Sequence, residues 1–281
     1  ALMAQREHPD AIVAVMPSDH RIDNEGAFLA AVGRAAEVAA EGRLVLFGIR
    51  ASEPHTGYGY VKQGAMIPGF EGAYEVGGFA EKPDPETARR YLDEGGYSWN
   101  SGIFVLDVAT FIAELERLQP EILAAARAAL DGAVQDLEFL RLDKPAFSAA
   151  PSISVDYAVM ERTTKAAMLP IDVGWNDIGS WTSLWEIAPH DGNGNAVRGD
   201  AILEDAKGCY VQSEKGLVAA IGVDDLIIVD TPDALLVADK ARAQDVAKVV
   251  AKLKASGRKE HAQHLRNYRP WGYFETLSLG G

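Results

Sequence analysis

Two acidic residues far apart in the sequence each lie a few residues past the end of an apolar run. Asp19 follows the run at residues 11–16, and Asp177 follows the run at residues 166–173. In an open α/β sheet, ligands collect beyond the carboxyl ends of the strands. Two carboxylates meeting there would repel each other unless a cation lay between them, and Mg²⁺ takes one or two carboxylates and fills its other positions with water and phosphate oxygens. The pattern predicts a magnesium site for phosphate chemistry, with helix capping or a turn as the alternative role of each aspartate.

A second pair of charged residues, Glu81 and Lys82, follows a strand-like run that ends at Phe79 and Ala80. Lys82 can neutralise a phosphate as a compact point charge. Glu81 can accept hydrogen bonds from two sugar hydroxyls. The alternative is a surface ion pair at a strand end, which would contribute little.

Glycine and aromatic residues alternate at residues 57–60, where Gly59 lets the backbone approach a ligand and Tyr60 offers an aromatic face. Asn100 precedes Ser101-Gly102, and its amide can both donate to and accept from sugar hydroxyls. Both segments are also typical of ordinary turns.

Other candidate motifs carry no chemistry. The glycine-rich stretch at residues 192–199 lacks the dinucleotide-binding spacing. His261 and His264 lie one helical turn apart without a third metal ligand nearby, and Ser154 lacks a nucleophile-elbow context.

Composition narrows the function classes. The chain has 281 residues, is 48% hydrophobic and carries a formal net charge of −14, which disfavours nucleic acid and anionic membranes as partners. The one cysteine, Cys209, fits a reducing, cytoplasmic compartment. No apolar run is long enough to span a bilayer.

The chain starts without Met inside a helix-like segment and stops after a strand-like run, so we expect a fragment truncated at both ends.

The elements that must position these residues alternate at the start of the chain. Residues 11–16 read as a buried strand, and Asp23 or Asn24 caps a following helix that places Leu29 among its apolar residues. Residues 44–49 form the next strand, so the unit is strand–helix–strand and predicts a parallel sheet. Shorter strands follow from residue 57, helices fill about 109–129, and a helical turn or two spans 156–162.

After Pro189 the pattern changes, because short strand-like runs between residues 201 and 237 follow one another without a helix. We therefore expect a small all-β segment at 190–240 and an amphipathic helix near 246–253.

Taken together, the segments resemble one family. MPSDH, TGYGYV, FAEKP, WNSGIF, SVDYAVME and VGWNDIGSW occur in the order seen in bacterial mannose-1-phosphate guanylyltransferases, and the later part resembles the bifunctional type with a C-terminal mannose-6-phosphate isomerase domain. The resemblance implies an α/β fold with a Rossmann-like nucleotide-diphospho-sugar transferase sheet whose N-terminal part is missing, followed by a β-helix-like segment. It divides the chain into an incomplete transferase domain at 1–189, the β segment at 190–240, and a linker helix with the start of a truncated cupin isomerase at 241–281.

The resemblance also implies a reaction, in which mannose 1-phosphate attacks the α-phosphorus of GTP to give GDP-mannose and pyrophosphate. Carried over by motif, Asp19 and Asp177 hold Mg²⁺, Lys82 binds the sugar's phosphate, Glu81 and Asn100 hold mannose hydroxyls, and Gly59 lines the pocket. Asp156 is a more distant candidate.

Two departures from the family pattern matter, because the glycine-rich loop with Thr-Arg-Leu and the Pro-Lys-Gln segment that cradle the triphosphate are absent here. We therefore expect little or no transferase activity from this polypeptide alone. Two alternatives stay open: a transferase for glucose 1-phosphate with UTP or dTTP, and a non-catalytic assembly module that forms a homodimer through the β segment.

Overall fold

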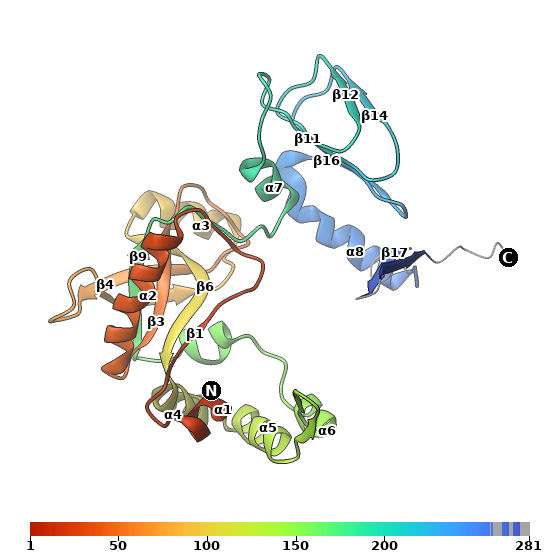
Figure 1. Ribbon diagram of the computed structural model, residues 1–281. Helices are drawn as coiled ribbons and strands as arrows, with labels where there is room; N and C mark the ends of the chain where they lie inside the picture. Colours follow the sequence, from red (N-terminus) through yellow and green to blue (C-terminus); the bar gives the residue numbers. More distant parts are fainter. Residues whose placement is uncertain (259, 261–265, 270–271, 276–281) are drawn as a thin grey trace. The chain divides into compact units, whose positions relative to one another are not determined.

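The computed structural model describes residues 1–258, 260, 266–269 and 272–275. The chain divides into two compact units, Ala1–Asn176 and Asp177–Gly281, which are described separately below (Figure 1). His261 and His264 lie outside the described residues. In the described part of the chain, no helix combines the length and the apolar character needed to cross a bilayer.

The first unit is a mixed α/β fold. Its elements in chain order are α1 (Leu2–Glu7), β1 (Ile12–Val15), β2 (Arg21–Ile22), α2 (Glu25–Ala40), β3 (Leu44–Arg50), β4 (Tyr60–Met66), β5 (Tyr74–Ala80), α3 (Pro85–Glu94), β6 (Tyr97–Asp107), α4 (Val108–Leu118), α5 (Pro120–Asp131), β7 (Val134–Asp136), β8 (Phe139–Arg141), α6 (Lys144–Ser148), the π-helix η1 (Asp156–Met160), β9 (Ala166–Ile171) and β10 (Trp175–Asn176). The expected helices near 109–129 and 156–162 are thus confirmed.

The main sheet has six strands in the order β1-β6-β3-β9-β5-β4 and is mixed rather than parallel. β1 precedes α2 in the chain and β3 follows it, and the two strands run in the same direction, as the strand–helix–strand pattern predicts. The long strand β6, however, lies between them in the sheet and pairs antiparallel with both. Of the pairings between described strands of this sheet, only β3 with β9 is parallel. The predicted parallel sheet is wrong, because a strand from later in the chain lies between β1 and β3 and runs antiparallel to both.

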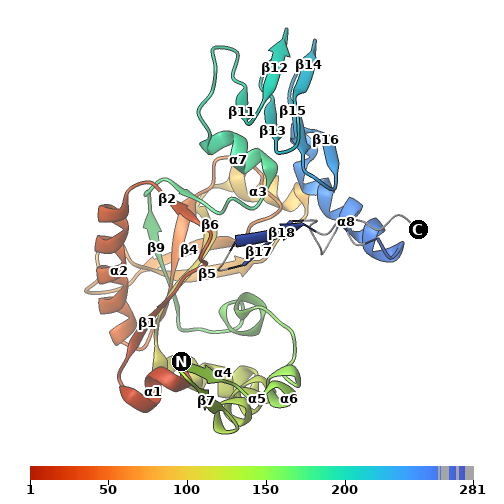
Figure 2. The same ribbon diagram turned by 45° about the vertical axis from the view of Figure 1, so that its right-hand side comes forward.

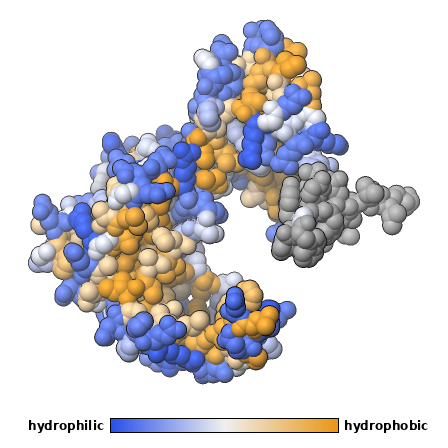
Figure 3. Space-filling model, viewed as in Figure 1, coloured by the Kyte–Doolittle hydropathy of each residue, from blue (hydrophilic) through white to orange (hydrophobic). Residues whose placement is uncertain are grey.

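β1 lies at the edge of the sheet, and the prediction that it is buried is also wrong. Ile12, Val15 and the following Met16 are exposed. An edge strand has a neighbour on one side only, so an apolar run does not guarantee burial. Hydrophobic surface gathers over this part of the first unit (Figure 3).

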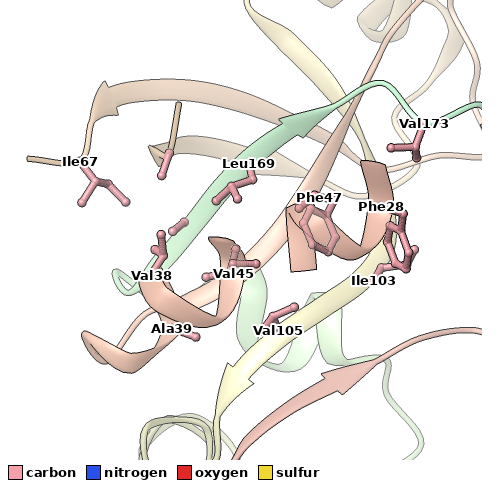
Figure 4. Close-up of a cluster of buried hydrophobic side chains, with 14 residues drawn as sticks. Phe28, Val38, Ala39, Val45, Phe47, Ile67, Ile103, Val105, Leu169 and Val173 are labelled. Carbon is pink, nitrogen blue, oxygen red and sulfur yellow. The ribbon is translucent and has the colours of Figure 1, made fainter. Parts of the chain in front are cut away.

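Helix α2 covers one face of the sheet. Asn24 caps it by accepting the Ala27 N–H at 3.0 Å, which selects Asn24 over Asp23 as the cap. The inward residues of α2 pack on β3, β6 and β9 (Figure 4): Phe28, Ala31, Ala35, Val38 and Ala39 against Val45, Phe47, Ile103, Val105 and Leu169. Leu29 is 68% exposed, contrary to expectation, because the helix turns about 100° between it and Phe28.

The opposite face of the sheet is covered by α4, the start of α5 and η1. A second apolar cluster joins them to Leu44, Leu46, Phe104 and Leu106 of the sheet. The sheet is therefore a middle layer with helices on both faces, which is the arrangement typical of α/β domains.

The second unit contains a short parallel β-helix. Its elements are α7 (Trp181–Ile187), β11 (Ala196–Arg198), β12 (Ala201–Glu204), β13 (Tyr210–Ser213), β14 (Val218–Ile221), β15 (Leu226–Asp230), β16 (Leu235–Asp239), the 3-10 helix η2 (Lys240–Asp245), α8 (Val246–Ala255), β17 (Arg266–Arg269) and β18 (Gly272–Glu275). The odd strands β11, β13 and β15 stack in parallel, and β12 pairs with β14 in parallel as a second sheet (Figure 2). The chain therefore alternates between two sheets, and β16 turns back antiparallel on β15 at the end of the stack. This confirms the small all-β segment.

Candidate active site

Three predicted site residues converge at the start of β4 because of strand register. Tyr60, the first residue of β4, pairs with Ala80 of β5 on one side and with Trp99 of β6 on the other. The neighbouring positions Gly59, Glu81 and Asn100 therefore lie together, and the Asn100 N–H donates to the Gly59 carbonyl at 2.8 Å.

Gly59 occupies a position where a side chain would not fit. A Cβ built there would overlap Oε2 of Glu81 and would lie 3.3 Å from Cβ of Asn100. The missing side chain leaves room for the Glu81 carboxylate, so the two residues form one compact feature of the site.

Glu81 and Lys82 present their charges differently. The Glu81 side chain is 9% exposed, whereas that of Lys82 is 61% exposed, with 3.4 Å between Nζ of Lys82 and Oε1 of Glu81. Lys82 has φ of +48°, a left-handed conformation that is uncommon for a residue with a side chain. Glu81 is therefore held inward while the ammonium of Lys82 faces solvent, where it can meet a phosphate.

Asn100 is buried and is held by two side-chain hydrogen bonds. Its Nδ2 donates to Oδ1 of Asp156 at 2.9 Å, and its Oδ1 accepts the Gly102 N–H at 3.2 Å. A primary amide offers two N–H groups and two lone pairs. Asn100 therefore keeps one donor and one acceptor for a ligand in a fixed orientation.

The two inward carboxylates are both harder to ionise than usual. Burial raises the pKa of Glu81 above its ordinary value, and the nearby charge of Asp156 raises it further, with Lys82 opposing. Burial likewise raises the pKa of Asp156, while the hydrogen bond from Asn100 opposes this. Hydroxyl groups of a ligand that donate to these oxygens would offset the loss of hydration.

Asp19 follows the end of β1, and its neighbour His20 lies close to Gly102 of β6. His20 accepts a hydrogen bond at Nδ1 from Nε1 of Trp175 at 3.1 Å, and the His20 ring lies 3.9 Å from where a Cβ on Gly102 would be. β2 and β10 pair antiparallel with Arg21 opposite Asn176. Asp19 precedes β2 by two residues and Asp177 follows β10 directly in the sequence.

Asp177 begins the second unit and shapes the turn that follows it. Its Oδ1 accepts the Gly179 N–H at 3.0 Å, and Ile178 between them has φ of +51°. A left-handed conformation is costly for a β-branched residue, and such outliers cluster at functional sites. The carboxylate does serve a turn, which is the alternative role that the sequence analysis left open.

The described residues contain no group of three or more His, Cys, Asp or Glu side chains that could hold a metal ion. The donor chemistry still fits Mg²⁺, which needs only one or two protein carboxylates when phosphate oxygens and water complete its shell. Asp19 and Asp177 supply such a pair in type, whereas the neighbouring His20 already has its Nδ1 engaged by Trp175.

Comparison with known proteins decides the family. Residues 1–194 match the family model of the nucleotidyl transferases, and residues 199–253 match that of the MannoseP isomerase/GMP-like beta-helix domain. The chain belongs to the nucleotidyl transferase family. Members of this family typically use a divalent metal.

Individual relatives are consistent with this family. The chain is 48% identical to mannose-1-phosphate guanylyltransferase ManC of Salmonella typhimurium and 46% identical to mannose-1-phosphate guanylyltransferase of Escherichia coli K12, in each case over 100% of this chain. It spans 59% of the length of each of these relatives. The crystal structure of mannose-1-phosphate geranyltransferase from Thermus thermophilus is 31% identical, with a TM-score of 0.76 over 89% of this chain and 72% of that one. The resemblance drawn from the motifs is thereby confirmed.

Within this nucleotidyl transferase fold, Tyr60 is not placed to touch a ligand. Its side chain has no exposed surface, and its hydroxyl donates to the His55 carbonyl at 3.0 Å. It packs with Ala88 and Trp99 in a separate apolar cluster, beside Tyr58 and Tyr91. Tyr60 therefore packs in the core at the start of β4. The alternation of glycine and tyrosine in the sequence does not show whether a tyrosine ring points into the core or toward a ligand.

Two features of the site were not found from the sequence. Glu161 accepts the Glu81 N–H at Oε1, at 3.1 Å, and Asp23 packs against Gly174, where φ is +65°. Glu161 belongs to the SVDYAVME motif, but only the register of β5 and the position of η1 bring it to Glu81. Gly174 follows the run at 166–173, and a glycine at the end of a strand is the feature of the sequence that could have indicated this turn.

Proposed function

We propose that the whole protein transfers a guanylyl group from GTP to mannose 1-phosphate, giving GDP-mannose and pyrophosphate. An oxygen of the sugar phosphate forms a bond to the α-phosphorus of GTP, and the bond between the α-phosphorus and the bridging oxygen breaks to release pyrophosphate. The names of the two guanylyltransferase relatives, 48% and 46% identical, support this reaction.

The single observation that carries the proposal for this chain is the cluster formed by Gly59, Glu81, Asn100 and Asp156 beside Lys82. Buried acceptors next to an exposed cation suit a ligand that has hydroxyls at one end and a phosphate at the other. Glu81 would accept hydrogen bonds from mannose hydroxyls, Asn100 would use its remaining donor and acceptor, and Lys82 would hold the phosphate. Such chemistry depends on positioning and charge stabilisation more than on a covalent intermediate.

Asp19 and Asp177 are the residues that would hold Mg²⁺. A divalent ion there would supply neutralisation of the charge that builds up on the reacting phosphates. The pairing of β2 with β10 supports this assignment, because it fixes the two chain segments that lead to these aspartates next to each other up to Asn176.

The same proposal divides the chain by function. Residues 1–189 would form the transferase part, 190–240 the β segment through which two copies could pair as a homodimer, and 241–281 the link to an isomerase part. The match of residues 199–253 to a β-helix domain model supports a separate second part.

Pyrophosphate release from GTP and mannose 1-phosphate, measured on the whole protein with Mg²⁺ and with EDTA, tests the reaction. We expect turnover that depends on the metal and little turnover from the 281-residue chain alone. No release from this pair overturns the proposal, and faster release from glucose 1-phosphate with UTP or dTTP would select that alternative.

The sugar-phosphate site is tested in the same assay by Lys82→Ala, with the exposed Lys252→Ala on α8 as the matched control. Loss of a charge-assisted contact to phosphate should raise KM for mannose 1-phosphate about tenfold or more. An unchanged KM would remove Lys82 from the site.

A further inference from the structure

One short helix reaches the proposed site at both of its ends. η1 is a π-helix, and the Glu161 N–H donates to the Asp156 carbonyl at 2.9 Å, five residues earlier. Asp156 accepts from the Asn100 amide, and Glu161 accepts from the Glu81 backbone N–H. Of the four residues between them, Ala158, Val159 and Met160 are buried in the core and Tyr157 is exposed. Helices of this kind are rare and occur frequently at functional sites.

Glu161 contacts the backbone at the point where the strand end is most constrained. Its Oε1 accepts the Glu81 N–H at 3.1 Å. The next residue, Lys82, has φ of +48°. A hydrogen bond to a carboxylate is stronger than one between neutral groups. The bond therefore favours one orientation of the Glu81–Lys82 segment, from which both side chains enter the site.

This placement of Glu161 has an electrostatic cost. The charged groups that face Glu81 are Lys82, Asp156 and Glu161, and the charge of Glu161 adds to the effects that raise the pKa of Glu81. An exposed carboxylate serving stability alone gains nothing from lying beside two other carboxylates. The hydrogen bond from the Glu81 N–H to Glu161 explains why a carboxylate lies at this position.

We propose that Glu161 is a positioning residue that holds Glu81 and Lys82 in the geometry that binds the sugar phosphate, while Asp156, one π-helical turn before it, holds Asn100. The inference rests on the proposed function, since the site that Glu161 serves is the proposed one.

Glu161→Ala and Glu161→Gln in the whole protein separate the bond from the charge, with the exposed Glu116→Ala on α4 as the matched control. Glu161→Ala removes the acceptor and should raise KM for mannose 1-phosphate about tenfold while leaving KM for GTP within about twofold. Glu161→Gln keeps an acceptor oxygen, so its KM should stay within about twofold of the original. Because Glu161→Gln removes a charge that faces Glu81, the acid limb of its pH–rate profile should move to lower pH.

Hydrogen exchange at the Glu81 amide gives a readout that does not depend on turnover. Protection should fall in Glu161→Ala and persist in Glu161→Gln and Glu116→Ala. Equal rises in both KM values, an unchanged KM in Glu161→Ala, or unchanged protection would each overturn the positioning role. Absence of turnover in the original protein would instead overturn the proposed function, with the exchange result still deciding whether Glu161 holds this strand end.

Discussion

Glu81 and Asp156 keep their carboxylates in surroundings that favour the protonated form. Desolvation dominates for both, and the charges of Asp156 and Glu161 add to the rise in the pKa of Glu81. Lys82 offers limited compensation because its side chain is largely exposed and its ion pair is screened by water. The site therefore gives up stability in the ligand-free protein to keep acceptors available for a ligand.

Glu81→Gln should stabilise the ligand-free protein at neutral pH. The folded-state pKa of Glu81 lies above its usual value of 4.5, so the folded protein binds this proton more tightly than the unfolded chain does. The free energy of unfolding therefore falls as pH rises from about 4.5 through the raised pKa, and Glu81→Gln lacks this loss. We expect a melting temperature about 2–4 °C higher at pH 7. The difference should vanish below pH of about 4.5, and a difference independent of pH would contradict the argument.

Gly59→Ala should damage sugar-phosphate binding while the fold persists. The new Cβ would overlap Oε2 of Glu81, the end of a side chain that can move away but then leaves its position in the site. We expect kcat/KM for mannose 1-phosphate to fall about tenfold or more, which corresponds to about 1.4 kcal/mol.

A matched control for Gly59→Ala is Gly33→Ala in α2, where nothing lies within 4 Å of the new Cβ. Turnover should stay normal there, and replacing glycine inside a helix should add about 0.5–1 kcal/mol to the free energy of unfolding. Normal kcat/KM in Gly59→Ala would show that Glu81 has no required position.

At the scale of elements, the sequence predicted which segments are helices and strands better than it predicted their neighbours. The cap at Asn24, the helices near 109–129 and the all-β segment follow from local patterns and are present. The order of the sheet does not follow, because the insertion of β6 between β1 and β3 depends on pairing over about 90 residues of chain. The exposure of β1 and Leu29 has the same origin, since periodicity alone does not say which face meets a partner.

Gly174→Ala should disturb the turn that leads into β10. Gly174 has φ of +65°, and a Cβ there would lie 2.7 Å from Cβ of Asp23, whose own N–H donates to the Val173 carbonyl at 3.0 Å. Both the backbone conformation and the contact oppose a side chain, so we expect a loss of about 1–3 kcal/mol in the free energy of unfolding. Chemical denaturation measures this loss. Gly192→Ala, with nothing within 4 Å and an ordinary φ, is the control, and equal effects of the two would contradict the explanation.

At the scale of the whole molecule, the proposed sugar-phosphate site draws on segments spread from Gly59 to Asp156, and the order of the motifs in the sequence is what connects them. The sequence predicted Glu81, Lys82 and Asn100 from their positions beside strands, and the register at Tyr60 explains why Gly59, Glu81 and Asn100 meet. It could not predict Glu161, because a contact between a side chain and the backbone of a residue 80 positions away leaves no local pattern.

Asp177→Asn in the whole protein separates the two roles of this residue. An asparagine keeps an Oδ1 that can accept the Gly179 N–H, so the turn with Ile178 should persist and the melting temperature should change by less than about 2 °C. The negative charge that would hold Mg²⁺ is lost, so metal-dependent pyrophosphate release should fall about 100-fold or more. Asp177→Ala also removes the acceptor of the Gly179 N–H, so it should lower both the melting temperature and metal-dependent pyrophosphate release. Near-normal turnover in Asp177→Asn together with low stability in Asp177→Ala would show that Asp177 serves the turn alone, and the metal would then need another carboxylate beside Asp19.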